Sequence, residues 1–248
     1  MNISGELVVL LRKAEYIVAL TGAGVSQESG LRTFRDAHSG LWKNHRPEDL
    51  ATPQAFTRNP KLVWDWYVMR RQKLRDAQPN PAHLALAEIA RQVPKFKLIT
   101  QNVDGLHLKA GSPEVVELHG NIQRVKCSSC GRQARTWNDA AGDVPRCDFC
   151  GELLRPDVVW FNESLPRAAL EIAIEAARNC QIFFSIGTSG VVQPAASLAY
   201  GARNRGAVVI EINTQSTPLT PKTDFALHGK AGEILPILVS EVWGTRVS

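Results

Sequence analysis

The stretch that decides the fold is YIVALTGAG at residues 16–24, where a short β-rich run leads directly into a glycine turn. Similar runs follow at residues 97–100, 182–186 and 208–212, and helical patterns lie between them. Short strands that alternate with helices are typical of βαβ units, which build parallel sheets. We therefore predict an α/β fold with a Rossmann-like, doubly wound parallel sheet.

Small and polar residues follow each of these runs. They are Thr21-Gly22-Ala23-Gly24, Gln101-Asn102-Val103-Asp104, Gly187-Thr188-Ser189 and Asn213-Thr214-Gln215. In an open parallel sheet, ligands bind outside the carboxyl ends of the strands. We therefore expect these segments to line one binding site.

The composition is that of an ordinary globular enzyme. The chain has 248 residues, of which 44% are hydrophobic, and a formal net charge of +5. No apolar run approaches the roughly 18 residues that span a bilayer, and the N-terminus lacks the pattern of a signal peptide. The basic residues are scattered, so an acidic partner is permitted but not required. We expect a cytoplasmic protein that does not associate with membranes.

Two segments interrupt the alternation of strands and helices. One, at about 36–92, is rich in Trp, Arg and Pro and predicts a helical insertion that begins with a loop. The other, at about 121–160, contains four cysteines and predicts a β-rich zinc-binding module. We expect a single domain over residues 1–248 that carries both insertions. Its large Rossmann-like part is predicted at about 1–35, 93–120 and 161–248.

The spacing of the cysteines indicates a zinc site. Cys127 and Cys130 form one C-x-x-C pair, Cys147 and Cys150 form a second, and 16 residues separate the pairs. This pattern is typical of two zinc knuckles that converge on one tetrahedral ion. Four thiolates leave no position for a water molecule. The Zn²⁺ ion is therefore expected to stabilise the fold and to take no part in catalysis.

Two other roles for the cysteines are less well supported. Cys180 stands alone in an apolar stretch, so we expect a buried small hydrophobic residue and not a nucleophile. A zinc ribbon can also bind nucleic acid, but the segment between the knuckles lacks interleaved basic and aromatic residues beyond Trp137. We therefore do not expect a nucleic-acid partner.

The turn Gly22-Ala23-Gly24 predicts a phosphate site, because backbone N–H groups at a helix N-terminus attract anions. The sequence nevertheless departs from the dehydrogenase fingerprint. Gln27 occupies the position of the third small residue, and no clear second strand ending in an acidic residue follows about 20 residues later. An ordinary NAD dehydrogenase is therefore disfavoured, and the two glycines alone fit a structural turn equally well.

Several further motifs make the chain similar to the sirtuin family. They are Thr33-Phe34-Arg35, TQNVDGLH at 100–107, Glu117-Leu118-His119-Gly120, Arg155-Pro156 with Val158-Val159-Trp160-Phe161, Gly187-Thr188-Ser189 and the four cysteines. The resemblance extends from about residue 8 to 240, and such a set in this order is highly specific. It points to the bacterial-type class III branch, which removes succinyl and malonyl groups.

The resemblance implies an NAD-dependent protein lysine deacylase. Sirtuins use NAD as a cosubstrate, cleave its nicotinamide bond and transfer the acyl group of a lysine side chain to ADP-ribose. The products are nicotinamide, O-acyl-ADP-ribose and free lysine. The expected cofactors are therefore NAD and one structural Zn²⁺ ion, and the expected partners are acylated-lysine proteins or peptides.

The resemblance also implies which residues contact NAD. The first glycine turn and Arg35 would approach the phosphates, and Phe34 would shield the reacting ribose. Polar residues after the second run would hold the nicotinamide half, and those after the third and fourth runs the adenosine half. The full expected set is Gly22, Ala23, Gly24, Ser26, Thr33, Phe34, Arg35, Trp42, Gln101, Asn102, Val103, Asp104, Gly187, Thr188, Ser189, Asn213, Thr214, Gln215 and Ala231.

His119 is the implied general base, and Asn102 is the other residue implied in catalysis. His119 would accept a proton relayed from the ribose hydroxyls, so that an oxygen can attack the alkylimidate formed when the acyl oxygen displaces nicotinamide. A histidine with an ordinary pKa of about 6.5 suits this task at neutral pH. A lone histidine is more often structural, but the surrounding motif favours catalysis here.

Val159, Trp160 and Phe161 form the implied peptide-binding edge, where an extended substrate adds as a strand. Many sirtuins have glycine between Phe161 and Glu163, whereas this chain has Asn162. Asparagine tolerates left-handed backbone angles nearly as well as glycine. We therefore expect the loop to keep its shape.

A pocket for acidic acyl groups is predicted by Tyr67 and Arg70, which lie three residues apart and hence on one face of a helix. The pair resembles the Tyr-x-x-Arg signature of sirtuins that remove succinyl and malonyl groups. A guanidinium can hold a terminal carboxylate through two bonds, while a phenol donates one more. The alternative is that Arg70 and Arg71 only solvate a helix face. Acetyl-lysine is expected to enter as well, because an empty arginine pocket weakens binding without blocking it.

Two other functions remain open at this point. A protein mono-ADP-ribosyltransferase would share the cleavage of nicotinamide but would transfer the ribose to a protein side chain. A non-enzymatic regulator would bind nucleotide and DNA through the zinc ribbon, although the intact His119 motif disfavours it. The sequence identifies neither the target proteins nor the oligomeric state, for which we take a monomer as the expectation.

Overall fold

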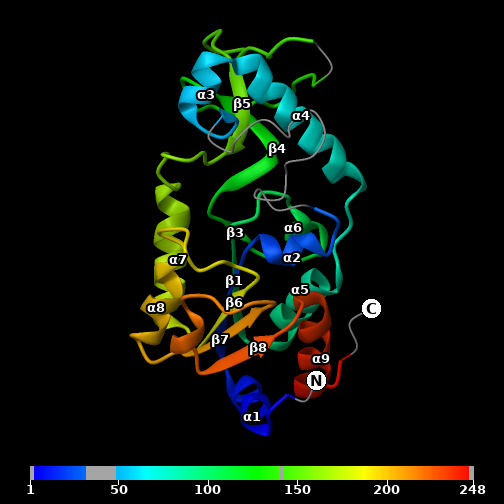
Figure 1. Cartoon of the computed structure of the whole chain (residues 1–248), viewed down its shortest axis with the longest axis vertical. Helices are drawn as coiled ribbons and strands as arrows, with labels where there is room; N and C mark the ends of the chain where they lie inside the picture. The colour runs from blue at the N-terminus through cyan, green and yellow to red at the C-terminus, as the bar shows by residue number, and fades with distance from the viewer. Residues whose placement is uncertain (1–2, 32–48, 140–141, 246–248) are drawn as a thin grey trace.

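The computed structural model describes residues 3–31, 49–139 and 142–245. Within them, six parallel strands form one sheet in the order β3-β2-β1-β6-β7-β8 (Figure 1). The strands are β1 (Tyr16–Thr21), β2 (Lys95–Thr100), β3 (Val116–Glu117), β6 (Ile182–Ile186), β7 (Val208–Asn213) and β8 (Phe225–His228). The chain builds outward from β1 to β3 and then crosses to β6 on the other side of β1, so the sheet is doubly wound, as predicted.

All of the strands predicted from the sequence are confirmed, and β2 begins two residues earlier than predicted, at Lys95. Every residue of β1 and β6 is buried, which explains their continuous apolar pattern, because a parallel sheet is covered on both faces. The edge strands β3 and β8 are not apparent in the sequence. They contain only 2 and 4 residues, which is too short a pattern to detect.

Helices cover both faces of the sheet (Figure 1). One face carries α1 (Gly5–Lys13), α5 (Pro81–Gln92) and α9 (Ala231–Trp243), whose apolar side chains share a core with the inner strands. The other face carries α7 (Arg167–Asn179) and α8 (Ser197–Arg203) around a second core. The sheet is therefore the middle of three layers.

Helix α5 belongs to the large sheet by its packing. The sequence groups it with the helical insertion at about 36–92. In the structure, Leu86 and Ile89 of α5 are completely buried in the core that α5 shares with α9. The apolar face of the helix docks on the sheet, and the sequence pattern shows only that such a face exists, not what it packs against.

The far end of the molecule is a smaller unit, residues 49–76, 120–139 and 142–160, which we call the small module (Figure 1). Its elements are the antiparallel strands β4 (Gly120–Cys127) and β5 (Leu154–Val158) with the helices α3 (Pro53–Arg58) and α4 (Pro60–Asp76). Aromatic and aliphatic side chains of α3 and α4 pack against both strands. The rest of the described chain, built on the six-stranded sheet, is the large module.

The helices α3, α4 and α5 begin with the same N-capping pattern. The side chains of Thr52, Asn59 and Asn80 each accept a hydrogen bond from a backbone N–H in the first helical turn. A proline follows each of these caps, where its missing N–H costs nothing and its φ angle suits a helix. The caps fix the first residue of each helix, and so fix which side chains of α4 face β5.

The remaining elements are short. They are α2 (Ala23–Gln27), α6 (Leu106–Lys109) and the 3₁₀ helix η3 (Thr220–Lys222). Helices α2 and α6 follow the carboxyl ends of β1 and β2, where a ligand of a doubly wound sheet would lie. In the described ranges, no helix has the length and apolar character needed to cross a membrane.

Candidate functional site

The centre of the candidate site is the contact between the loops that follow β1 and β6, where the strand order of the sheet reverses. Thr21 and Ile186, the last residues of these strands, are register partners. Gly22 donates its N–H to the carbonyl of Ile186, and Gly24 donates to that of Gly187, both at 2.9 Å. The sequence predicts that these N–H groups face a phosphate. In the structure they join the two loops to each other instead.

Close packing of these loops explains the glycines. A Cβ atom on Gly22 would lie 2.7 Å from the carbonyl oxygen of Gly187, and one on Gly187 would lie 2.7 Å from the amide nitrogen of Val25. Gly187 also has a φ of +59°, in the left-handed region that favours glycine. Ala23 is exposed at the first position of α2, where an N–H has no partner inside the helix.

Polar side chains meet beside these loops in a buried network. Ser26 donates a hydrogen bond to Asp104 Oδ2 at 2.7 Å. Asn102 Nδ2 donates to Ser26 Oγ and to the carbonyl of Gly22, both at 3.0 Å. The network links the end of β1 to the end of β2, and it holds the amide of Asn102 in one orientation.

A second set of contacts links β2 to the loops after β6 and β7. Gln101 Nε2 donates to Thr188 Oγ1 at 3.0 Å. Asn213 Nδ2 donates to the carbonyl of Thr188 at 2.8 Å. Thr188 therefore lies between a residue expected on the nicotinamide side and one expected on the adenosine side.

Five other predicted NAD contacts lie at the margin of these networks. Val103 and Ser189 are half-buried, and Thr214 and Gln215 are exposed. Ala231 begins α9, and its side chain is buried in the core on that face of the sheet. Only the backbone of Ala231 can therefore face a ligand.

The predicted NAD contacts gather where the topology places ligands. The described ones follow the carboxyl ends of β1, β2, β6 and β7, apart from Ala231. The edge formed by parallel strand ends is the usual ligand site of a doubly wound sheet. Four predicted contacts lie outside the described residues, namely Thr33, Phe34, Arg35 and Trp42.

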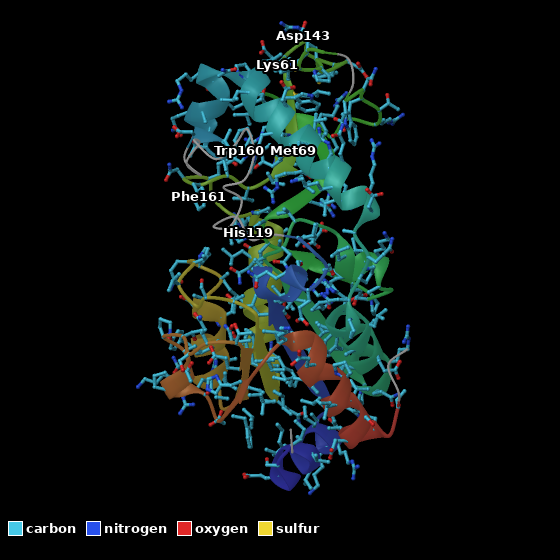
Figure 2. The ribbon with its side chains drawn as sticks, turned by 45° about the vertical axis from the view of Figure 1, so that its right-hand side comes forward. Lys61, Met69, His119, Asp143, Trp160 and Phe161 are labelled. Atoms are coloured by element: carbon cyan, nitrogen blue, oxygen red, sulfur yellow. The ribbon has the colours of Figure 1, made fainter. Side chains whose placement is uncertain are left out.

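His119 lies between β3 and β4, where the two modules meet (Figure 2). Its Nδ1 is 2.9 Å from the carbonyl oxygen of Gln101. A carbonyl oxygen only accepts, so Nδ1 carries the hydrogen and Nε2 is left as a proton acceptor. Burial lowers the pKa of His119, so its imidazole is neutral at pH 7. The side chain can therefore act as a base through Nε2.

Tyr67 and Arg70 lie beside each other on α4, as predicted. The guanidinium carbon of Arg70 is 5.7 Å from the ring centroid of Tyr67 and 4.6 Å from that of Trp66. Burial lowers the pKa of Arg70, and the electrostatic influence of Tyr67 and Asp104 acts in the opposite direction. Arg70 is thus a partly desolvated cation within electrostatic range of the buried network at Asp104.

Trp160 packs into the same cluster. Its Nε1 donates to Tyr67 Oη at 3.0 Å, and its ring centroid is 5.3 Å from that of Phe56. The sequence predicts Trp160 at the peptide-binding edge, but the side chain is buried and faces α4. Phe161 is 51% exposed and lies in the turn that the N–H of Glu163 closes on the carbonyl of Trp160 at 3.1 Å. Figure 2 shows both residues above His119.

The loop that carries these aromatic residues is tied to the predicted base. Val159 donates its N–H to the carbonyl of His119, and Phe161 donates to that of Ala51, both at 2.9 Å. Asn162 has a φ of +69°, so asparagine does adopt the left-handed conformation at the position where many sirtuins have glycine. The loop is therefore fixed to both the junction and the small module.

Arg71 is a buried structural residue, so the part of the alternative in which Arg71 solvates a helix face is wrong. The Arg71 guanidinium pairs with Asp139 through Nη2–Oδ1 at 2.5 Å and Nε–Oδ2 at 3.0 Å. It also lies 4.8 Å from the ring centroid of Trp64. The buried ion pair ties α4 to the segment between the two cysteine pairs.

The four cysteines converge in the small module. Their Sγ atoms lie within 4.8 Å of one another, with Cys127–Cys150 at 3.4 Å and Cys130–Cys147 at 3.9 Å. Tetrahedral Zn–S bonds of about 2.3 Å require S···S separations of about 3.8 Å. The N–H groups of Ser129 and Cys130 also donate to Cys127 Sγ at 3.4 Å, which stabilises a thiolate. The arrangement fits one structural zinc ion.

Cys180 behaves as the sequence predicts. The side chain is buried beside α7 and belongs to the apolar core on that face of the sheet. Burial raises the pKa of the Cys180 thiol to about 12. The residue is therefore protonated at neutral pH and is a packing group, not a nucleophile.

One ion pair at the site is missed by sequence reasoning. Arg155 donates to both carboxylate oxygens of Glu163, at 2.6 and 2.8 Å. Its guanidinium carbon lies 3.3 Å from the ring centroid of Trp160, and Glu163 also accepts the N–H of Trp160 at 2.8 Å. Arg155 belongs to a motif noted in the sequence and Glu163 follows that motif, but their spacing does not show that the chain folds back to pair them.

Comparison with known proteins places this geometry in a family context. The model of the Sir2 family matches residues 22–194. A Pyrococcus furiosus protein named NAD-dependent protein deacylase is 50% identical over 244 residues, covering 96% of this chain and 97% of that relative. The matched lengths span both modules.

Solved structures agree with this similarity. A crystal structure of a Sir2 homologue in complex with NAD is 48% identical, with a TM-score of 0.92, and the match covers 97% of this chain and 94% of that one. Sir2Af2 bound to a myristoylated histone peptide is 37% identical, with a TM-score of 0.77, over 96% of this chain and 94% of its own. The similarity in fold thus extends to homologues solved with cosubstrate and with acylated peptide.

Proposed function

Because the chain belongs to the Sir2 family, we propose that it removes succinyl and malonyl groups from protein lysine side chains, and acetyl groups as well. It shares its enzyme class with its curated relatives, that of NAD-dependent protein lysine deacylases. The products are then nicotinamide, O-acyl-ADP-ribose and free lysine. The myristoylated peptide bound by Sir2Af2 supports acylated-lysine peptides as substrates.

The observation that carries the acyl preference is the position of Arg70. Its guanidinium is partly withdrawn from water beside Tyr67, and the surrounding cluster, which includes Val158 and Trp160, is apolar. A desolvated cation is stabilised by an anion that pairs with it. The methylene groups of a succinyl chain would pack in the apolar part, and its terminal carboxylate would meet Arg70. An acetyl group would fill only the apolar part.

We propose His119 as the general base and Asn102 as the second catalytic residue. Nε2 of the neutral His119 imidazole would accept the proton relayed from the ribose hydroxyls of NAD. The hydrogen bond from Nδ1 to Gln101 would keep the ring in the correct tautomer. The amide of Asn102, held by Ser26 and Gly22, would be presented in a fixed orientation.

The loops beyond the strand ends are the proposed NAD site. Because Gly22 and Gly24 use their N–H groups to join the loops, Ala23 and Arg35 are the better candidates for contact with the phosphates. The nicotinamide half would lie along 101–104 and the adenosine half along 187–189. The other proposed contacts are Ser26, Thr33, Phe34, Trp42, Asn213, Thr214, Gln215 and Ala231.

We further propose that the substrate peptide lies along Val159 and the exposed Phe161, and that Trp160 supports this edge from beneath. The whole chain would act as one catalytic domain, with a zinc-binding module at about 121–160. Helix α5 supports a smaller helical insertion than the sequence predicts, because it packs with the large module.

The acyl preference is tested with the variant Arg70→Met, which removes the cation and keeps an unbranched side chain. Removal of a charge-assisted hydrogen bond costs about 1.5–3 kcal/mol, so kcat/KM for a succinyl-lysine peptide should fall by about ten- to a hundredfold. The value for a matched acetyl-lysine peptide should fall much less. Both reactions are followed by mass spectrometry of peptide and O-acyl-ADP-ribose.

Arg75→Met is the matched control, because Arg75 lies on the same helix and is exposed. It should leave both reactions as they are in the wild-type protein. If the wild-type protein prefers acetyl-lysine and Arg70→Met changes the two reactions equally, the chain is still a deacylase but the acidic pocket is wrong.

A further inference from the structure

We propose that Trp160 is a specificity-determining residue, which directs the hydroxyl group of Tyr67 toward the acidic end of the acyl group. The inference rests on the proposed preference for succinyl and malonyl groups, and it adds a residue to that pocket. The starting observation is the buried hydrogen bond of 3.0 Å from Trp160 Nε1 to Tyr67 Oη. Both side chains are almost completely buried.

The direction of this hydrogen bond is fixed by chemistry. An indole N–H can only donate, whereas a phenol can donate and accept, so Tyr67 is the acceptor. A phenolic O–H prefers to lie in the plane of its ring, which leaves it two directions. The hydrogen of Tyr67 cannot point toward the indole hydrogen. Trp160 therefore restricts the hydroxyl group of Tyr67 to orientations in which its hydrogen points away from the indole.

The remaining orientation leaves a donor without an acceptor. Within the described part of the chain, the hydroxyl of Tyr67 accepts from Trp160 and donates to no other group. Arg70 beside it carries only donors. Burial raises the pKa of Tyr67, so the phenol keeps its proton. A carboxylate bound at Arg70 could accept from both residues, whereas an acetyl group has no terminal acceptor to offer.

Trp160 is itself held rigidly. Its backbone N–H donates to Glu163 Oε2 at 2.8 Å, and the guanidinium carbon of Arg155 lies 3.3 Å from its ring centroid. Arg155 in turn binds both oxygens of Glu163 and the carbonyl of Val158. A donor fixed in this way keeps its direction when the pocket is empty, so the hydroxyl of Tyr67 is oriented before the substrate arrives.

The test separates the N–H group of Trp160 from its packing. Trp160→Phe removes the donor and keeps an aromatic ring in the cluster. The ratio of desuccinylation to deacetylation, each as kcat/KM, should fall about threefold to tenfold, the factor that one hydrogen bond contributes. Trp64→Phe is the matched control, because Trp64 is another buried tryptophan of the small module and its Nε1 has no partner in the described residues. It should leave the ratio unchanged.

A second pair of variants identifies the mechanism. In a Tyr67→Phe background the hydroxyl is absent, so adding Trp160→Phe should not lower the ratio further. An unchanged ratio in Trp160→Phe, or a fall that persists in the Tyr67→Phe background, would overturn the inference while leaving the acidic pocket intact. A wild-type protein that removes acetyl groups in preference to succinyl groups would contradict the proposed pocket, and the inference with it.

Discussion

The large and small modules are stabilised in different ways. In the large module, helices on both faces of the sheet enclose two apolar cores. The small module has smaller apolar clusters and adds a cysteine quartet and the buried ion pair Arg71–Asp139. A second, partly buried pair joins its Arg155 to Glu163, just beyond the module. A two-stranded sheet buries too little apolar surface to be stable alone. The small module therefore adds a metal site and charged pairs to the packing of its two helices on the strands, whereas the large module is built around its two apolar cores.

The largest effect on activity is expected from a substitution at His119, where the two modules meet. His119→Ala should reduce kcat/KM for any acylated peptide by about a hundred- to ten-thousandfold, because general-base catalysis contributes a factor of this size. Both modules should remain folded, since His119 is a half-buried side chain between two strands. Turnover is measured by mass spectrometry, and folding by thermal melting and zinc content.

The pH profile of the wild-type enzyme provides the control for this role. A base is active when it is neutral, so activity should be lost as the pH falls through the pKa of His119. Burial lowers this pKa from its ordinary value of about 6.5, so kcat/KM should be maintained until the pH is below that value. Substantial turnover by His119→Ala would show that another group is the base.

The next largest effect is expected from removal of zinc, which should affect the small module and not the large one. Removal of zinc with a chelator should allow the two cysteine pairs to move apart, so β4, β5 and α4 should become more mobile. Deacylation should be lost at the same time. Amide hydrogen exchange should rise throughout the small module, whereas β1 and β6 keep their protection because their apolar cores are unaffected.

Re-addition of Zn²⁺ should restore both protection and activity. A uniform loss of protection across the two modules would show that they unfold as one cooperative unit, and that the difference in their stabilisation has no consequence for local unfolding.

The smallest effect concerns the large module. Gly187→Ala should lower the free energy of unfolding by about 2–3 kcal/mol, because the new Cβ requires a left-handed backbone and crowds the loop after β1. That Cβ would lie 2.7 Å from the amide nitrogen of Val25. Gly206→Ala is the control, since Gly206 also has a positive φ but open space around it. Urea unfolding measures the free energy of unfolding of both variants. Equal losses of stability would mean that the loops move apart enough to accommodate the new Cβ atom.

The sequence predicted the large module well because its signals are local. Each inner strand is a short apolar run that ends in small or polar residues, and parallel topology brings all such ends to one edge. The predicted NAD contacts near β1, β2, β6 and β7 therefore lie together. The cysteine spacing is equally local, and it predicted a metal site that the Sγ positions fit. In both cases the spacing of residues along the chain was enough to predict the site, because each pattern lies within one turn or at one strand end.

Tertiary structure decided what each of these side chains contacts. The N–H groups of Gly22 and Gly24 bind the neighbouring loop, and α5 packs on the sheet. Trp160 turns inward to Tyr67, 93 residues away along the chain. These partners come from distant segments, and no local pattern encodes a contact between them. The sequence by itself thus determined the fold class, the family and the chemical groups available, and only the folded chain determined their partners, because hydrogen bonds and burial depend on proximity in space.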